Sequence, residues 1–410
     1  MARKGKQQDN TPVSDAENTI VFPAVRDDVA FEEDPTEEEK LLSRRDFRKA
    51  AFSMLAAVIL FAACILLWMF RDRFDADSLV ILSADKVAEA QAEYIFDNGS
   101  SQVFAKAGSG LAAASYTGLE LMDASGDLTV SYLFKMKTPA IAAGDSFAVF
   151  YDLGGTAMCA AWFDGTVKEV AAPGNIYSVT VSDGGYITVT SDYTGYRALV
   201  TVYDARFEPV YEWYSSSAWV ISGQVSPDNR QLAVLSYTAS GSEVRFFSLS
   251  DTEQKAAFSV SDTVLLDVHW LTQNQLCAYS TEQALFFSDS GRWNDTYSFD
   301  GLYLTDCTFD GDGYAAFALS QYRAGSTARL VTLDAGGRVL GTADVLSEIV
   351  SITASGAELL VLCPDGAILF SSSLNEKGQL GGLTGFKYAL LRGRGEALLV
   401  SANFAEVYSF

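Results

Sequence analysis

Short apolar runs that end in a polar residue recur from residue 119 to the C-terminus of this 410-residue chain. When the runs are lined up on their final Asp or Ser, eight copies emerge, whose last residues lie 37 to 46 positions apart. The copies are Leu119–Asp123, Ala160–Asp164, Val200–Asp204, Val244–Ser248, Ala284–Ser288, Leu330–Asp334, Ala367–Ser371 and Ala405–Ser409. A fixed period of about 41 residues indicates one structural unit repeated along the chain.

A second set of short apolar runs precedes the first by about ten residues in every repeat. These runs are Leu111–Ser115, Phe147–Asp152, Ile187–Asp192, Leu232–Tyr237, Leu276–Ser280, Ala315–Ser320, Leu359–Cys363 and Leu398–Ala402. Strands in phase, separated by Gly, Asp, Asn and Ser, are typical of the four-stranded blades of a β-propeller. The amphipathic patterns of helical repeats are missing. The fold class is therefore predicted to be all-β.

The second set of runs is rich in Ala, Val and Leu, so we expect it to form the innermost strands at a crowded central channel. Leu128–Phe134 and Pro139–Ala143 are examples of the two outer strands of a repeat. The last repeat reaches Phe410 after only two strands, and an open sheet edge would be a liability. Ala92–Asp97 and Gln102–Ala107 are expected to supply its outer strands. This closure predicts eight blades in residues 92–410, or seven if one weak repeat is irregular.

Residues Ala50–Phe70 contain no charged side chain, and as a helix they would be about 31 Å long, enough to cross a bilayer. Five cations precede the span, at Lys40, Arg44, Arg45, Arg48 and Lys49, whereas Arg71 and Arg73 follow it among acidic residues. This asymmetry predicts a cytoplasmic N-terminus. We expect a single-pass anchor at 44–73 with the bilayer as a partner, a linker at 74–91, and an extracytoplasmic propeller.

Forty-nine residues before the apolar segment are too many for an ordinary cleaved signal peptide. Phe61–Cys64 resembles a degenerate lipoprotein cleavage site, but apolar residues continue after Cys64, which favours the uncleaved anchor. Residues 1–43 are polar and acidic and are predicted to form a disordered cytoplasmic tail. Within it, the apolar island Thr19–Val25 is interpreted first as part of a solvated spacer with incidental apolar residues. The alternative is that it binds a cytoplasmic partner, with Thr19 or Thr11 as a phosphorylation site.

Two features carry a resemblance to a known family. Ser226–Val234 (SPDNRQLAV) is similar to the inter-blade turn of bacterial propellers, in which a Ser-Pro-Asp turn leads into an inner strand. The basic-flanked span followed by Tyr94–Phe96 and by repeats such as Gly118–Asp123 resembles an uncharacterised domain-of-unknown-function family of membrane-anchored propellers from Gram-positive bacteria. The resemblance covers roughly residues 45–410. It implies the fold and the location of the protein, and it brings no activity, cofactor or site residue.

Candidate catalytic and metal-binding residues are few. Asp267 could orient His269, the only histidine, but a nucleophile motif is missing, so a structural role in a strand is favoured. Asp310 and Asp312 offer two carboxylates in a glycine-rich turn, but Asp183-Gly184-Gly185 occupies the same place in an earlier repeat, which favours a tight turn over a calcium site. Four cysteines fall in predicted strands as small buried residues, although a disulfide remains open: Cys159, Cys277, Cys307 and Cys363.

The net negative charge disfavours some classes of partner, and a tyrosine-rich stretch is a candidate binding surface. From residue 50 onward there are 20 Lys and Arg against 40 Asp and Glu, a net charge of about -20, which disfavours nucleic acid and anionic wall polymers. A tyrosine-rich stretch either lines a sugar or peptide platform or, as is commoner, fills the space between sheets. It comprises Tyr193, Tyr196, Tyr203, Tyr211, Trp213, Tyr214 and Trp219.

We therefore predict no catalytic, cofactor-binding or metal-binding residues, and a non-enzymatic interaction or scaffold module that binds an envelope protein. The alternative is a transmembrane sensor or adaptor, in which the propeller binds an external ligand and the tail recruits a cytoplasmic partner. A propeller lyase or hydrolase acting through carboxylates at the channel is the third hypothesis. The prediction of an interaction module rests on analogy with other propellers.

Overall fold

The computed structural model describes residues 79–80, 82, 89–96, 102–251, 253–323, 325 and 327–410. All regular structure within these residues is β-strand. Among them no helix is long and apolar enough to span a membrane. The predicted tail 1–43, the span Ala50–Phe70 and most of the linker 74–91 lie outside the described residues.

The first four blades follow one another along the chain. Blade 1 contains β3 (Val103–Ala107), β4 (Gly110–Ala114), β5 (Gly118–Met122) and β6 (Leu128–Leu133). Blade 2 contains β7 (Pro139–Ala143), β8 (Phe147–Asp152), β9 (Ala157–Trp162) and β10 (Val167–Ala171). Blade 3 contains β11 (Ile176–Val181), β12 (Ile187–Tyr193), β13 (Tyr196–Tyr203) and β14 (Pro209–Ser215). Blade 4 contains β15 (Trp219–Val225), β16 (Gln231–Thr238), β17 (Gly241–Ser248) and β18 (Gln254–Ser261).

The last four blades include two that recruit strands from the N-terminal side. Blade 5 contains β19 (Asp267–Trp270), β20 (Gln275–Tyr279), β21 (Gln283–Ser288) and β22 (Trp293–Ser298). Blade 6 contains β23 (Tyr303–Gly311), β24 (Tyr314–Ser320), β25 (Ala328–Asp334) and β26 (Val339–Val345), with β1 (Leu79–Val80) added in parallel to β26. Blade 7 contains β27 (Ser351–Ser355), β28 (Glu358–Cys363), β29 (Gly366–Ser371) and β30 (Glu376–Gly381). Blade 8 contains β31 (Tyr388–Gly393), β32 (Glu396–Val400), β33 (Phe404–Ser409) and β2 (Ala92–Ile95).

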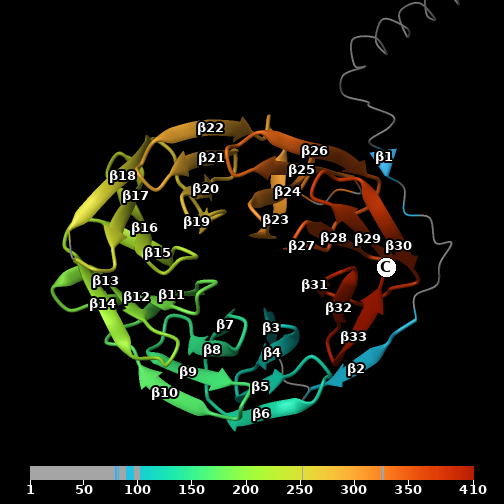
Figure 1. Ribbon diagram of the computed structural model, residues 1–410, viewed down its shortest axis with the longest axis horizontal. Helices are drawn as coiled ribbons and strands as arrows, with labels where there is room; N and C mark the ends of the chain where they lie inside the picture. Colours follow the sequence, from blue (N-terminus) through green and yellow to red (C-terminus); the bar gives the residue numbers. More distant parts are fainter. Residues whose placement is uncertain are drawn as a thin grey trace, which may run out of the picture. The chain divides into compact units, whose positions relative to one another are not determined.

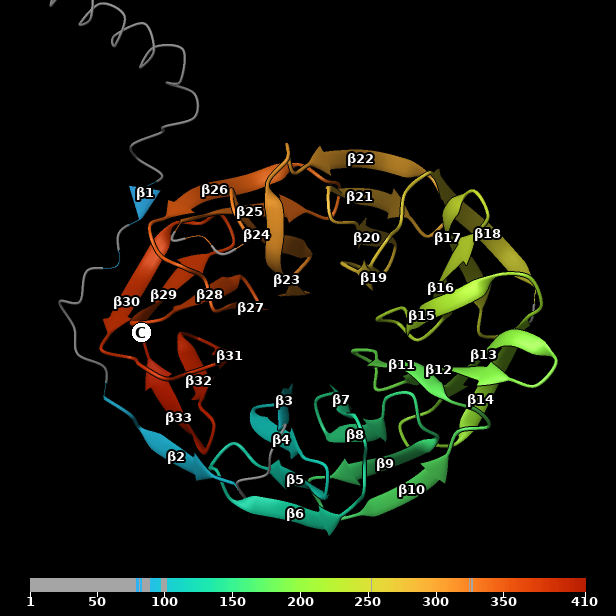
Figure 2. The ribbon, with the colours of Figure 1, turned by 180° about the vertical axis from the view of Figure 1, so that it is seen from behind.

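The eight sheets stand as radial blades around one axis and form a closed ring (Figure 1). Viewed from behind, the blades follow in the opposite rotational sense, and β2 lies beside β33 where the propeller closes (Figure 2). In seven blades the four principal strands are consecutive in sequence, although blade 6 also carries the added strand β1, and blade 8 is composite. The prediction of an eight-bladed propeller is therefore confirmed.

The closure differs from the prediction in its strand count. β2 is the outer strand of blade 8, as expected, but Val103–Ala107 is the innermost strand of blade 1 rather than an outer strand of blade 8. The N-terminal side therefore supplies one strand and the C-terminal side three. Pro139–Ala143 is likewise the innermost strand of blade 2.

Burial explains why the runs that we expected to be innermost are in fact the second strands of their blades. The runs predicted to be innermost, such as β8, are second strands, and every residue of β8 is buried because neighbouring blades cover both of its faces. Four of the five residues of the innermost strand β3 are only half-buried. The most apolar strand therefore lies one position out from the axis, where packing on both faces is complete.

The polar residue that ends each repeat run shapes the turn into the outer strand. Asp204 Oδ1 accepts hydrogen bonds from the backbone N–H groups of Arg206 (2.9 Å) and Glu208 (3.0 Å). Asp334 Oδ1 accepts from Gly336 (2.9 Å) and Arg338 (3.0 Å) in the same way. Such side-chain-to-backbone bonds favour tight turns, which is the physical reason that the repeat retains Asp or Ser here.

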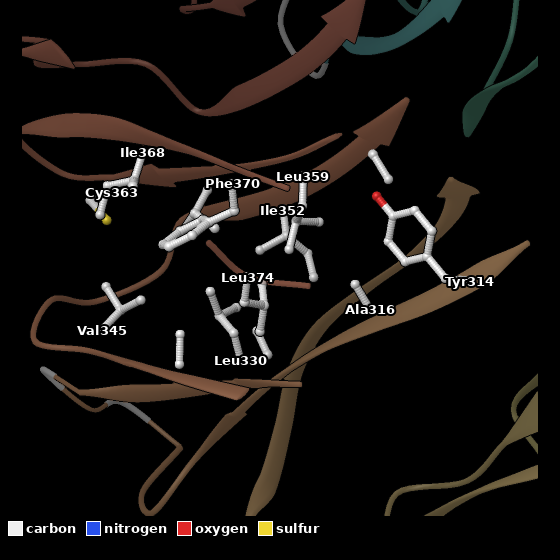
Figure 3. Close-up of a cluster of buried hydrophobic side chains, with 14 residues drawn as sticks. Tyr314, Ala316, Leu330, Val345, Ile352, Leu359, Cys363, Ile368, Phe370 and Leu374 are labelled. Atoms are coloured by element: carbon white, nitrogen blue, oxygen red, sulfur yellow. The ribbon is translucent and has the colours of Figure 1, made fainter. Parts of the chain in front are cut away.

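Apolar clusters between adjacent blades hold the ring together. In the cluster between blades 6 and 7, Phe370 and Leu359 of blade 7 pack against Leu330 and Val345 of blade 6 (Figure 3). Complete burial of a side chain of this size stabilises a fold by about 1.5 to 3 kcal/mol. Val80 packs against this cluster, so the segment that leads into the propeller is attached to blade 6.

Candidate functional site

The two ends of the ring carry different side chains. Because strands alternate in direction, the turns between first and second strands and between third and fourth strands lie at one end of every blade. The turns between second and third strands, and the connections to the next blade, lie at the opposite end. At this second end exposed apolar side chains gather, and we call their surface the aromatic face.

The aromatic face is defined by exposed side chains from the eight blades and the connections between them. They are Tyr116, Leu133, Leu153, Tyr177, Tyr196, Tyr214, Trp219, Val264, Leu266, Tyr303, Tyr322, Leu346, Val350 and Tyr388. A single exposed apolar side chain needs no explanation, whereas apolar side chains grouped on one surface are typical of interaction sites.

Tyrosines gather on blade 3 within the aromatic face. The ring centroids of Tyr193, Tyr196 and Tyr214 are 5.0 to 6.1 Å apart. Nearby, the Arg197 guanidinium lies 4.8 Å from the ring centroid of Trp219, which is 52% exposed. This arrangement presents flat rings and one cation to solvent.

The tyrosine-rich stretch of the sequence is thus divided between two roles. Tyr203 and Tyr211 are buried in the core, and Trp213 packs on Phe247 with ring centroids 4.9 Å apart. The remaining members, Tyr193, Tyr196, Tyr214 and Trp219, lie at the surface or partly so. The core interpretation therefore holds for Tyr203, Tyr211 and Trp213, and the binding platform stays a prediction for the other four.

A pocket of about 770 Å³ opens on the aromatic face over blade 6 and its two neighbours. Its wall includes Leu266 and Glu282 of blade 5, Tyr303 and Arg323 of blade 6, and Glu348 and Ile349 at the entry to blade 7. The Arg323 guanidinium lies 5.7 Å from the ring centroid of Tyr303. The carboxylates of Glu282 and Glu348 are exposed and form no ion pair with the described residues. The pocket is large enough for a ligand of several hundred daltons.

Sequence reasoning did not find the residues of this pocket, although one signal was present. The interval from Ser288 to Asp334 is the longest of the repeat periods, at 46 residues. Within it, seven residues separate β24 from β25, whereas two to four separate the corresponding strands of the other blades. Insertions in one repeat frequently lie at the binding surface of a repeat protein, and this one carries Tyr322 and Arg323.

His269 lies on the innermost strand of blade 5 in contact with Asp267. Its Nε2 is 3.3 Å from Asp267 Oδ2, its Nδ1 is 3.3 Å from Gln224 Nε2, and its ring stacks on Phe309 at 4.0 Å. The Ser222 hydroxyl donates to Asp267 Oδ1 at 2.8 Å, so it meets the carboxylate and not the imidazole. Burial would raise the pKa of Asp267, but the bonds from His269 and Ser222 hold that pKa below its usual value. The group joins blade 4 to blade 5 and lacks the geometry of a nucleophile and its base.

The two acidic turns lie at the end of the ring opposite to the aromatic face. Asp310 and Asp312 lie in and just after the end of β23, and the backbone N–H of Asp312 donates to Gly356 O of blade 7 at 2.9 Å. Asp183 occupies the equivalent turn of blade 3. Partial desolvation raises the pKa of Asp183, and the nearby carboxylates Asp145, Asp310 and Asp312 raise it further. Within the described ranges, no three His, Cys, Asp or Glu side chains form a group that could hold a metal ion.

The four cysteines of the propeller are free thiols within strands. Cys159, Cys277 and Cys363 are buried, and Cys307 is half-buried. Burial raises the pKa of Cys159 to about 12 and that of Cys307 to about 11. In this part of the chain the cysteines therefore serve as core side chains.

The fold and these surfaces define an eight-bladed β-propeller whose exposed apolar residues concentrate at one end. By sequence, the chain belongs to the family of unknown function DUF5711, whose profile matches residues 85–373. No curated protein matches the chain in sequence.

Solved structures with the same fold are distant in sequence. Chaetomium thermophilum Sqt1, bound to the N-terminus of the ribosomal protein L10, is 11% identical with a TM-score of 0.55, over 79% of this chain and 100% of that chain. The computationally designed protein Ika8 is 11% identical with a TM-score of 0.53, over 80% and 100%. The β-propeller domain of Myceliophteria thermophila Cps50 (Swd1) is 9% identical with a TM-score of 0.50, over 79% and 99%. At this level of identity the likeness establishes the fold.

Proposed function

We propose that this protein is a non-enzymatic interaction module that binds a protein partner through the aromatic face of its propeller. The concentration of exposed aromatic and aliphatic side chains at one end of the ring is the observation that carries the proposal. Tyr and Trp are enriched at protein interfaces because they bury a large area while losing little side-chain entropy. Sqt1, which has the same fold, was captured with a segment of another protein, a use of the fold that supports the proposal by analogy.

The same proposal places the propeller outside the cytoplasmic membrane, anchored by the apolar segment Ala50–Phe70. The partner is then a protein of the cell envelope. The net charge of about -20 beyond residue 49 makes nucleic acid an unfavourable partner in any compartment.

Site-specific photo-crosslinking in intact cells tests the proposal. A photoreactive amino acid replaces Trp219 or Tyr322 on the aromatic face, and matched controls replace Trp293 or Val339, exposed residues at the first positions of outer strands. We expect a discrete crosslinked protein from the first two positions and none from the controls. Equal crosslinking at all four positions, or crosslinking at the controls alone, would reject the aromatic face as the interface.

The pocket at Tyr303 favours a second candidate, a sensor that binds an external ligand and recruits a cytoplasmic partner through residues 1–43. Deletion of residues 1–43 separates the two functions. The interaction module retains all its crosslinked partners after the deletion, whereas the sensor loses a cytoplasmic one.

A further inference from the structure

We infer that the pocket at Tyr303 receives a basic segment of the partner, with a Lys or Arg side chain entering between Glu282, Glu348 and the ring of Tyr303. This inference rests on the proposed function, because it names the chemistry of the partner that binds the aromatic face. It assigns the pocket to a peptide bearing positive charge.

Charge is the first reason. Two exposed carboxylates, Glu282 and Glu348, flank the pocket without a cationic partner among the described residues. The portion of the chain that follows residue 49 has 40 acidic and 20 basic side chains, so its long-range field also attracts a basic segment. An acidic partner would be repelled by the two carboxylates at the pocket and by the net negative charge of the chain.

The ring of Tyr303 is the second reason. It is 46% exposed, and the guanidinium of Arg323 already lies 5.7 Å from its centroid. The face of this ring is therefore open to a cation at the distance of a cation–π contact. Arg323 belongs to the long loop between β24 and β25 and is itself exposed, so a cation from a partner can replace it there.

This arrangement predicts effects of opposite sign for the charged residues of the pocket. Removing a carboxylate weakens binding of a basic segment, whereas removing Arg323 strengthens it, because Arg323 competes for the ring of Tyr303 and repels the incoming charge. A ligand with negative charge would give the reverse pattern. A neutral sugar would respond to neither change.

The test uses the full-length chain in detergent micelles and fluorescence anisotropy of a labelled peptide, Gly-Lys-Lys-Arg-Gly. A neutral peptide with Gln in place of the basic residues and an acidic peptide with Glu serve as comparison probes. The double variant Glu282→Gln/Glu348→Gln is compared with Glu253→Gln/Glu376→Gln, which removes the same charge from the opposite end of the ring. Arg323→Gln is the third variant, and thermal melting checks that each one is folded.

We expect the pocket double variant to weaken binding of the basic peptide about tenfold, the control double variant to change it less than twofold, and Arg323→Gln to strengthen it about threefold. Equal weakening by both double variants would overturn the inference, since general attraction by net charge would then explain the binding. Tighter binding of the acidic or the neutral peptide would overturn it as well.

Crosslinking from Trp219 and Tyr322 distinguishes failure of this inference from failure of the proposed function. If the pocket variants bind the peptides as tightly as the unaltered chain does, the inference fails. If the crosslinked partner is still found in that case, the proposal that the aromatic face binds a protein is retained. If the crosslinked partner is absent from the unaltered chain, the proposed function fails.

Discussion

The guanidinium of Arg392 donates a hydrogen bond to the phenolic oxygen of Tyr94 and lies 5.3 Å from the centroid of its ring. Tyr94 is completely buried in β2, and Arg392 belongs to β31, the innermost strand of the same blade. The Tyr94 hydroxyl donates in turn to the carbonyl of Ala124 at 2.7 Å, with that of Asp123 at 3.0 Å. One phenol therefore joins the N-terminal and C-terminal strands of blade 8 to blade 1, at the point where the ring closes.

Loss of the Tyr94 hydroxyl is expected to lower the stability of the fold at the point where the ring closes. Tyr94→Phe leaves the carbonyl of Ala124 and the guanidinium of Arg392 without their shared partner, which should destabilise the fold by about 1 to 2 kcal/mol. Thermal melting measures the effect. Tyr132→Phe is the control, because its hydroxyl bonds to Glu169 between exposed outer strands and should contribute little. Equal melting temperatures for both variants and the unaltered chain would contradict a role in closure.

Glu358 makes the protein sensitive to acid. Burial alone would raise its pKa, but the Lys377 ammonium and the backbone N–H of Gly395 hold the pKa below its usual value. Stability from this carboxylate is then present above the unfolded pKa of about 4.5 and is lost as the pH falls through the lower folded pKa. We expect Glu358→Gln to cost about 1 to 3 kcal/mol at pH 7 and to flatten the loss of stability between pH 5 and 3. Urea unfolding at several pH values measures this, with the exposed Glu376→Gln as the control.

Tyr211 is expected to contribute to the loss of folding stability at alkaline pH. Burial raises its pKa to about 12, and its hydroxyl has no hydrogen-bond partner among the described residues. The neutral phenol is therefore favoured in the fold, and the corresponding stability is lost as the pH rises from 10 towards 12. Tyr211→Phe should be neutral or stabilising by up to about 1 kcal/mol at pH 7 and should reduce the alkaline loss. A clear destabilisation at pH 7 would indicate a partner for the hydroxyl.

The thiols of the propeller should resist modification in the folded protein. Cys159 and Cys277 are fully buried, and a raised pKa keeps them as unreactive thiols. Maleimide labelling at pH 7.5 followed by peptide mass spectrometry should leave both unlabelled, with Cys307 reacting first among the four. In guanidinium chloride all four should react. Complete labelling of Cys159 without denaturant would contradict the core packing.

His269 tests the structural interpretation of the Asp267 group. His269→Asn removes the stacking on Phe309 and should lower stability by about 1 kcal/mol. Crosslinking from Tyr322 should stay unchanged, because the His269 ring contacts Asp267, Gln224 and Phe309 and is not one of the exposed side chains of the aromatic face. Loss of the crosslink in a variant that melts normally would assign His269 to partner binding.

The repeat period and the polar residue ending each run were enough to predict the architecture, because Asp204 and Asp334 act locally on their own turns. The innermost strand was assigned wrongly, because composition reports how completely a strand is covered and not how far it lies from the axis. β8 is covered on both faces and β3 is not.

The pocket was beyond sequence reasoning for a different reason. Glu282, Tyr303, Arg323 and Glu348 come from three blades and are ordinary surface residues individually. Their chemistry depends on which turns meet at one end of the ring, and that follows from strand direction and blade order. Only the long loop between β24 and β25 could be recognised in the sequence, because it lengthens one repeat interval to 46 residues.

The pairing of Ala92 with Val407 has a consequence for the order of events during synthesis. The segment that becomes β2 emerges from the ribosome more than 300 residues before β33, and it has no sheet to join until translation is almost finished. A truncated product that lacks β31 to β33 would leave Leu111 and Met122 of blade 1 without their blade 8 neighbours. Such unfinished chains expose apolar side chains that chaperones and proteases recognise. These side chains become buried only when the last blade is complete.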